Sequence, residues 1–456
     1  MQDAFQAQWP GERLREAPGN ALLKKRPPPA ANRGGIRTPD PGCIVSAKSA
    51  DTMAKREDAP ASAAERASSA DPRDRARALV PLIREHADEA DRERRLPTRV
   101  ATAMAAAGLY KVAAPRSIGG GECDPRTQIE TIEIVSAADG AAGWNLMIGI
   151  ENMGFLGAAL PLETARKLYA DEGLIVSGAL NPLGRATPVE GGYQVTGQWP
   201  FASGCHNAGW FWGQCMVTDG DGLAKSKSGG PMLREVLIPS SEFEILDTWH
   251  VSGLRGSGSH DVAAHDVFVP EERVTAVLEG GMQLRETGTL YRYPPFNRLA
   301  YNKIGVATGI AKAALEHFKT LASEKQPRAS RKLLREKISV HLDYAEAVAS
   351  LGAARAYALE SIEEVWRVVD AGSVPSAEQR MHVHLSCAHA CQSAVHSVEL
   401  LYSAAGTTAN FTRCPLDRCL RDVRVVPQHI MVSPQWKETA GRVLLGLPGD
   451  SPFFND

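Results

Sequence analysis

Two short polar loops around a β-hairpin are the part of this chain whose residue types most clearly permit chemistry. The segment 175–212 has the sequence IVSGALNPLGRATPVEGGYQVTGQWPFASGCHNAGWFW, with polar loops at 177–184 and 203–207. Trp199 and Phe201 lie between the loops. Short hydroxyls and backbone N–H groups beside aromatic walls can hold a flat heteroaromatic ring. An ordinary hairpin with its aromatic side chains in a core has the same pattern, and periodicity alone favours that interpretation.

Three motifs carry a family resemblance that favours the cofactor-binding interpretation over an ordinary hairpin. They are GYQVTGQWPFASG at 192–204, DTWHVSGLRGSGSHDV at 247–262 and RCLRDVRVVPQH at 418–429. The first resembles the central β-domain of the acyl-CoA dehydrogenase superfamily. Together the three are similar to the flavin-dependent monooxygenases of that superfamily. These are oxygenase components of two-component systems that hydroxylate phenols and related aromatics, or oxidise sulfur or nitrogen.

Length and composition exclude several other classes of protein. The chain has 456 residues, enough for two or three domains, and its 43% hydrophobic and 23% charged content is typical of a soluble globular protein. A net charge of -2 predicts no nucleic-acid partner and no attraction to anionic lipid. We expect no membrane span, because no apolar run is long enough. Eight cysteines without a secretory signal indicate reduced thiols and a cytoplasmic location.

The first part of the chain does not resemble a folded domain. Residues 1–51 are rich in Pro, Arg and Ala and have no sustained periodicity. The string GGIRTPDPGC at 34–43 resembles a peptide translated by mistake from a tRNA gene. We therefore predict that residues 1–70 are disordered or spurious, and that Met53 is the true start.

The remaining periodicity predicts an α+β fold in which helices precede and follow a β-region. Helical patterns fill 71–172, period-two strands fill 173–285, and long helices fill 286–456. The expected helices lie near 97–107, 126–138, 141–156, 162–171, 303–323, 331–370, 376–405, 415–429 and 435–444. This order matches the superfamily, which implies an N-terminal helical domain, a central β-barrel or sandwich and a C-terminal four-helix bundle.

The resemblance implies which residues would hold a flavin. Ser203 and Gly204 correspond to the loop at the N5/O4 edge of the ring, and Ser177 and Asn181 to the loop that covers it. The further cofactor residues that it implies are Trp199, Phe201, Arg328, Gly406 and Thr407. The basic residues near Arg328 would contact the pyrophosphate of a neighbouring subunit, which favours FAD over FMN.

His429 and Ser203 are the predicted catalytic residues. Acyl-CoA dehydrogenases take their base from a carboxylate at one of two places, and neither 415–436 nor 301–310 contains a glutamate. Imidazole titrates near neutrality and suits deprotonation of a phenol or assistance to a hydroperoxide. The alternative for His429 is a cap at a helix C-terminus.

Four residues are predicted to contact the substrate: Trp144, Asn145, His206 and Ser257. For Trp144 and Asn145 core packing is an equal alternative, and His206 stands in a run that departs from the relatives. The cluster HVHLSCAHACQSAVH at 382–396 places His384, Cys387 and Cys391 on one helical face. Because no partner motif supplies further ligands, we expect tight helix packing there and no metal.

The resemblance implies an oxygenase that uses externally supplied reduced FAD or FMN and O2 to oxygenate a small substrate, expected to be aromatic, through a C4a-hydroperoxyflavin. Its partners would be a separate NAD(P)H-flavin reductase and further copies of itself, as a homotetramer or homodimer. An acyl-CoA dehydrogenase-type flavoenzyme is one alternative, and a non-catalytic flavin-binding oligomer is another.

Overall fold

The computed structural model describes residues 71–220, 222–227, 229–277, 284–451 and 453–454. The predicted N-terminal extension 1–70, with the proposed start at Met53, lies outside these residues. The described residues belong to one compact unit, Pro60–Asp456.

The first helices begin where an aspartate can cap them. Asp71, Asp124 and Asp139 each accept a backbone N–H of the first turn with the side chain, which satisfies a donor that the helix itself leaves open. The helices of this region are α2 (Pro72–Glu85), α3 (Ala87–Glu93), α4 (Thr98–Ala106), α5 (Pro125–Ser136), α6 (Gly140–Ala159) and α7 (Leu162–Tyr169). α6 is apolar on nearly every side and is buried along almost its whole length.

The middle of the chain forms one twisted, mixed sheet. Its strands are β1 (Val176–Val189), β2 (Gly192–Trp199), β3 (Trp210–Asp219), β4 (Gly222–Leu223), β5 (Leu233–Pro239), β6 (Glu244–Leu246), β7 (Asp261–Pro270) and β8 (Val274–Thr275). The strand order is β6-β7-β2-β1-β3-β5-β8, with β4 on β3. β1 and β3 are parallel, and the other pairs are antiparallel. A turn at Gly191 joins β1 to β2, and Gly191 there has a φ of +80°, which glycine adopts without strain.

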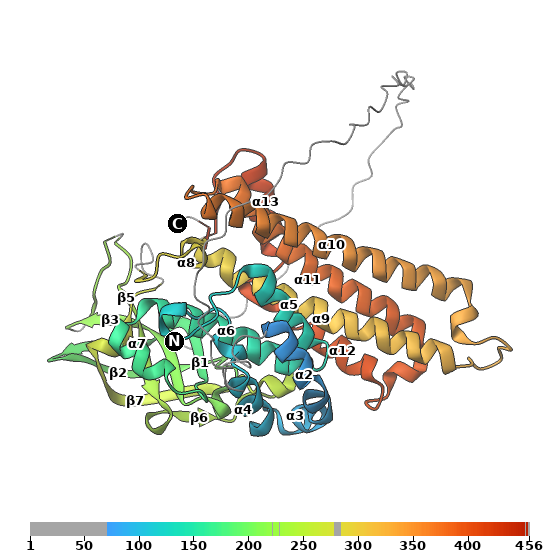
Figure 1. Cartoon of the computed structure of the whole chain (residues 1–456), viewed down its shortest axis with the longest axis horizontal. Helices are drawn as coiled ribbons and strands as arrows, with labels where there is room; N and C mark the ends of the chain where they lie inside the picture. Colours follow the sequence, from blue (N-terminus) through green and yellow to red (C-terminus); the bar gives the residue numbers. More distant parts are fainter. Residues whose placement is uncertain (1–70, 221, 228, 278–283, 452, 455–456) are drawn as a thin grey trace, which may run out of the picture. The chain divides into compact units, whose positions relative to one another are not determined.

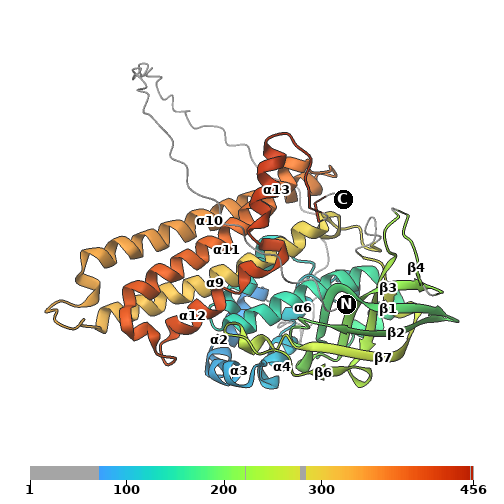
Figure 2. The same cartoon turned by 180° about the vertical axis from the view of Figure 1, so that it is seen from behind.

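The last part of the chain is a helical bundle. Its helices are α8 (Thr289–Arg292), α9 (Pro295–Glu324), α10 (Ile338–Asp370), α11 (Ala377–Ala405), α12 (Pro415–Val423) and α13 (Gln435–Leu444). In Figures 1 and 2, α6 lies between the sheet and the bundle, and it contacts both β1 and α9. This helix therefore joins the two halves of the molecule.

The order of helices, sheet and helices confirms the predicted fold class, while three helix ends differ from the prediction. α9 begins at Pro295, well before 303, because proline is favoured in a first turn whose N–H groups have no helical partner. α10 begins at Ile338 rather than 331, because the Glu336 carboxylate accepts the N–H of Leu333 and Lys337 is extended. The helix predicted over 415–429 ends at Val423. No helix of the described part of the chain combines the length and the apolar character needed to cross a bilayer.

Candidate active site

The Ser203 loop is held in a strained conformation against a second loop. Phe201 has a φ of +63° and Gly204 a φ of +76°, and such a φ in a residue that is not glycine is often found at functional sites. The N–H of Gly204 donates to Ser257 O at 3.0 Å, and that of Ala202 donates to His260 O at 3.0 Å. The loops 201–204 and 257–260 therefore form one rigid body.

A buried chain of serine hydroxyls connects these loops. Ser203 Oγ lies 2.7 Å from Ser259 Oγ, which lies 2.7 Å from Ser257 Oγ. The indole Nε1–H of Trp144 donates to Ser203 Oγ at 3.1 Å. All four side chains are buried. Because each hydroxyl can donate one hydrogen bond and accept two, this chain can present Ser203 outward either as a donor or as an acceptor.

His429 completes the cluster from the C-terminal side. Its ring meets Trp144 edge-on, with centroids 5.8 Å apart and an interplanar angle of 62°. Burial, and secondarily the ammonium of Lys303, hold the pKa of His429 well below its usual value, so the imidazole is neutral. Since Nδ1 accepts the N–H of Met431 at 3.2 Å, the proton of the neutral ring is assigned to Nε2. The contacts of His429 thus favour a hydrogen-bond donor over a base.

Lys303 reaches this region as half of a buried ion pair. Its Nζ lies 2.5 Å from Glu151 Oε2, with side-chain exposures of 1% and 5%. Burial raises the pKa of Glu151 and lowers that of Lys303, because the low-dielectric interior disfavours both charges. The pair links α6 to α9 below the Trp144–His429 contact.

The surface beside the serine chain fits a flat aromatic cofactor. Phe201 is 62% exposed, and its ring meets Trp249 edge-on at 6.1 Å. Ser177 Oγ donates to the backbone oxygen of Ser203 at 3.0 Å. At Gly204 a Cβ would lie 2.4 Å from Asn145 Oδ1, so a larger residue would displace the Asn145 amide and would also be strained at a φ of +76°. An exposed aromatic face next to a hydrogen-bonding edge is what an isoalloxazine ring requires.

The structure places the other predicted cofactor residues apart from this surface. Trp199 is fully buried in the β-domain, where its ring packs on Phe211 and its N–H donates to Gln214 O at 2.7 Å. Asn181 is exposed where the register of β1 against β3 shifts. Arg328, Gly406 and Thr407 are exposed at turns of the bundle. No contact described here brings these residues to Ser203 within one chain.

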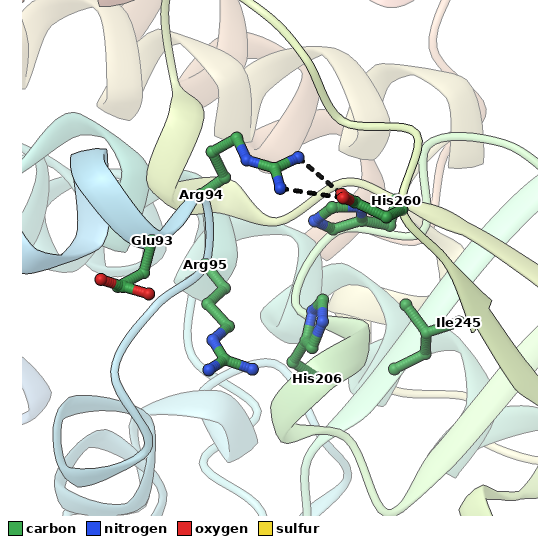
Figure 3. A pocket seen from close by; sticks show the side chains of 7 residues that line it. Glu93, Arg94, Arg95, His206, Ile245 and His260 are labelled. Atoms are coloured by element: carbon green, nitrogen blue, oxygen red, sulfur yellow. Dashed lines mark hydrogen bonds and ion pairs between the residues drawn. The ribbon is translucent and has the colours of Figure 1, made fainter.

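His206 lies in a surface crevice of about 250 Å³ (Figure 3). Its ring meets His260 edge-on at 4.9 Å, and on the wall Arg94 binds Asp247 through both carboxylate oxygens at 2.6 and 3.0 Å. Burial, His260 and Arg95 lower the pKa of His206 to about 4. His206 therefore belongs to this polar crevice rather than to the hydrogen bonds of the serine chain.

The histidine and cysteine cluster on α11 packs in the core of the bundle. His384 stacks on Trp436 with centroids 3.6 Å apart and an interplanar angle of 3°, and burial lowers its pKa to about 3. Cys387 and Cys391 are buried free thiols whose pKa values burial raises. Among the described residues, no group of three or more His, Cys, Asp or Glu side chains is arranged to hold a metal ion.

Three residues of this region were not singled out from the sequence. Ser259 lies in the middle of the serine chain. Because Ser257 ends a short 3-10 helix and Gly258 has a φ of +55°, strand alternation gives no signal that the two hydroxyls meet. Trp249 pairs with Phe201. Asp422 is a carboxylate on the buried face of α12, between Cys419 and Val423, where a charge is unusual.

Comparison with known proteins agrees with this geometry. The family model of the acyl-CoA dehydrogenase N-terminal domain matches residues 53–163, and that of the C-terminal domain matches 304–434. Indole-3-acetate monooxygenase of Pseudomonas putida is 33% identical over 381 residues, which cover 82% of this chain and 94% of that protein. The flavin-dependent monooxygenase oxygenase subunit HsaA of Mycobacterium tuberculosis H37Rv is 27% identical over 373 residues, covering 78% and 90%.

Among solved structures, 3-HSA hydroxylase from Rhodococcus sp. RHA1 aligns with a TM-score of 0.75 and 26% identity, covering 85% of this chain and 100% of that one. The sequence and fold similarities extend over both helical regions and the sheet between them. The chain belongs to the flavin-dependent monooxygenases of the acyl-CoA dehydrogenase superfamily.

Proposed function

We propose that this monooxygenase oxygenates a small aromatic acid, with reduced flavin delivered by a separate NAD(P)H-flavin reductase. The observation that supports this most directly is the buried chain from Ser257 through Ser259 to Ser203, closed by the Trp144 N–H. Such a chain supplies a hydrogen-bonding edge that is shielded from water. The relatives named as an oxygenase subunit and a monooxygenase support the division of labour with a reductase.

The chain's own residues fit a flavin at this edge. Phe201 and Trp249 offer an aromatic face, and Ser203 lies where N5 would be held. When bound, the reduced flavin supplies the electrons and the oxygen-activating chemistry. Ser203 can accept the N5–H or donate to N5, because the proton of Ser259 can turn either way.

Trp144 and His429 face the substrate side of this edge in our proposal. His429 donates through Nε2–H to a substrate oxygen, which orients the ring to be oxygenated. Asn145 supports the Ser203 loop from α6, where its Nδ2 donates to Ala141 O at 3.1 Å and contacts Gly256 O at 3.4 Å. A general base is not needed at His429 for this role.

For the substrate we propose indole-3-acetate or a related aromatic acid as the first class to test. The support is the 33% identity to indole-3-acetate monooxygenase over nearly the whole length of that protein. The acyl-CoA dehydrogenase alternative has no such support, because the relatives reported above are named monooxygenases or hydroxylases.

We further propose that FAD is the preferred flavin and that the site is shared between copies of the chain. Ile338 and Leu342 are 77% and 67% exposed on α10, and such an apolar strip on a long helix indicates an interface. In a homodimer or homotetramer formed there, Arg328, Gly406 and Thr407 would serve a neighbouring copy's cofactor, where the guanidinium pairs with a pyrophosphate.

The proposal is tested with the full chain and chemically reduced FAD or FMN, mixed with oxygenated buffer and indole-3-acetate. Product and hydrogen peroxide are both quantified. We expect hydroxylated product to account for most of the flavin oxidised, and FAD to give more product than FMN. If every aromatic acid tested leaves peroxide as the sole product, the substrate class is wrong. If acyl-CoA instead bleaches oxidised flavin on this protein, the oxygenase function is wrong.

A further inference from the structure

The carboxyl of Asp422 on α12 lies at a point where three segments of the site meet. Its Oδ1 accepts the N–H of Leu254 at 2.6 Å, and Leu254 begins the turn that carries Ser257. The side chain of the neighbouring Arg421 donates to Ser252 O at 2.7 Å. Two consecutive residues of α12 therefore fasten the same loop.

This loop lies directly on the backbone of α12. A Cβ at Gly253 would lie 2.0 Å from the backbone oxygen of Arg421, so no other residue allows this approach without a shift of the chain. Leu254 takes up a left-handed φ of +50°, a conformation that is unfavourable for residues other than glycine. The hydrogen bond to Asp422 therefore holds a backbone conformation that is unfavourable by itself.

The other carboxyl oxygen of Asp422 lies against the start of α6. A Cβ at Gly140, the first residue of that helix, would lie 3.1 Å from Asp422 Oδ2. Asp139 caps α6 through Ala142 N at 2.8 Å, and Trp144 follows one turn later. One carboxyl group therefore lies beside the start of the helix of Trp144 and is hydrogen-bonded to the turn that leads to Ser257 and Ser259. Asp422 stands at the end of α12, which finishes at Val423, and His429 follows seven residues after Asp422.

Charged groups of three elements face this carboxyl. Asp139 at the start of α6 and Arg418 and Arg421 on α12 act on Asp422 directly. Asp91 on α3 faces Asp139 and both arginines. The Cys419 thiol is also near Asp422. Both carboxyl side chains are buried. Burial and then Asp139 raise the pKa of Asp422 to about 7, and burial raises that of Asp139 as well.

The two arginines compensate this site only in part, because each has a partner elsewhere. Arg418 pairs with Asp88, while Arg421 binds Asp417 at 2.9 Å and Asp91 at 3.3 Å. Burial raises the pKa of both carboxyls, and the charge of Asp139 raises that of Asp422 further, so neither group ionises as readily as an exposed aspartate.

We propose that Asp422 is a positioning residue for oxygenation, because its carboxyl fastens the loop of Ser257 and Ser259 to the helices that carry Trp144 and precede His429. The expected effect of Asp422 on oxygenation rests on the proposed function. The attachment of the loop by Asp422 does not depend on that function. Ionisation of Asp422 at higher pH places a charge in a buried site beside Asp139, and opening of the loop to water relieves the cost of that charge. Water then reaches the hydrogen-bonding edge at Ser203.

The test compares Asp422→Asn, Asp422→Ala and a control on another helix. The amide oxygen of the Asn variant still accepts the Leu254 N–H but cannot ionise, while the Ala variant lacks the acceptor. The control is Asp74→Asn, which makes the same substitution at an exposed aspartate of α2 that pairs with Arg77. The first readout is the ratio of oxygenated product to peroxide between about pH 6 and pH 9.

We expect the product fraction of the wild type to fall as pH rises, with a midpoint near the pKa of about 7. The Asn variant should keep a high, flat product fraction, and Asp74→Asn should keep the wild-type profile. The Ala variant should lose product at every pH. A wild-type profile in Asp422→Asn, or a flattened profile in Asp74→Asn, would overturn the proposal.

A second readout separates this inference from the proposed function. Amide hydrogen exchange of residues 252–259, corrected for the intrinsic pH dependence of exchange, needs no flavin or substrate. We expect protection in the wild type that declines as Asp422 ionises, constant protection in Asp422→Asn, and weak protection throughout in Asp422→Ala. Uniform protection in all variants overturns the attachment even if oxygenation is found. Failure of oxygenation with the expected exchange pattern refutes only the proposed function.

Discussion

Replacement of Ser203 by alanine is the most direct test of the serine chain. The substitution removes one oxygen from a side chain that is 5% exposed. Trp144 Nε1 then loses the acceptor that lies 3.1 Å away, while Ser259 keeps Ser257 as a partner at 2.7 Å. A buried donor left without an acceptor costs about 1–3 kcal/mol. We therefore expect the free energy of unfolding to decrease by about that amount.

The change should also have a catalytic effect that can be measured separately from stability. If the hydroxyl holds the flavin with a bond worth about 1–1.5 kcal/mol, its loss changes the ratio of peroxide to product by about tenfold. Both quantities are measured on the same sample, by urea unfolding and by product and peroxide assay. The matched control is Ser361→Ala, because Ser361 is also 5% exposed and its hydroxyl donates to Tyr357 O within α10. An unchanged ratio in the Ser203 variant, or an equal change in the Ser361 variant, would refute the reasoning.

Three further predictions concern single side chains. Gly204→Ala should lose flavin affinity and about 1–2 kcal/mol of stability, because a left-handed φ is unfavourable for alanine and its Cβ would meet Asn145 Oδ1 at 2.4 Å. Flavin titration and urea unfolding measure the two effects. Wild-type values in both would contradict the prediction. His384→Phe should make the free energy of unfolding less dependent on pH below about pH 6.5. In the wild type the pKa of His384 is lowered to about 3 in the folded state, so the unfolded chain binds a proton that the folded chain does not. The free energy of unfolding therefore declines as pH falls, by about 2–3 kcal/mol at about pH 4.5. Urea unfolding at both pH values measures this, and equal slopes for variant and wild type would argue against it. His429→Gln should retain more product than His429→Ala, because the amide can replace a neutral donor, whereas equal losses would favour a role as base.

The sequence predicts the arrangement of the fold better than the limits of its elements. The capping aspartate Asp139 and the long apolar run after it identify α6 to within a few residues. The starts of α9 and α10 were misplaced, because a proline can open a helix as well as end one and because the Glu336 contact outweighs the helical pattern.

The site was only partly predictable for a physical reason. Ser203, Trp144 and His429 were selected individually, but the hydrogen bond and ring contact that join them come from packing of distant segments. The aromatic pattern could not distinguish Trp199, which is a core residue, from Phe201, which is exposed, because the two residues lie on opposite sides of a proline turn. Strand alternation no longer applies once the backbone turns to a positive φ.

The serine chain also has a consequence for folding. Trp144 and Ser203 are 59 residues apart in the sequence, and Leu254 and Asp422 are 168 apart. Contacts this distant form only after long loops have closed, so they come late in folding. The core of the sheet around Trp199 can form from the middle of the chain, but the cofactor surface requires all three regions at once. Flavin therefore binds the completed fold and adds its binding free energy to that state alone, so flavin capture reports the end of folding rather than its beginning.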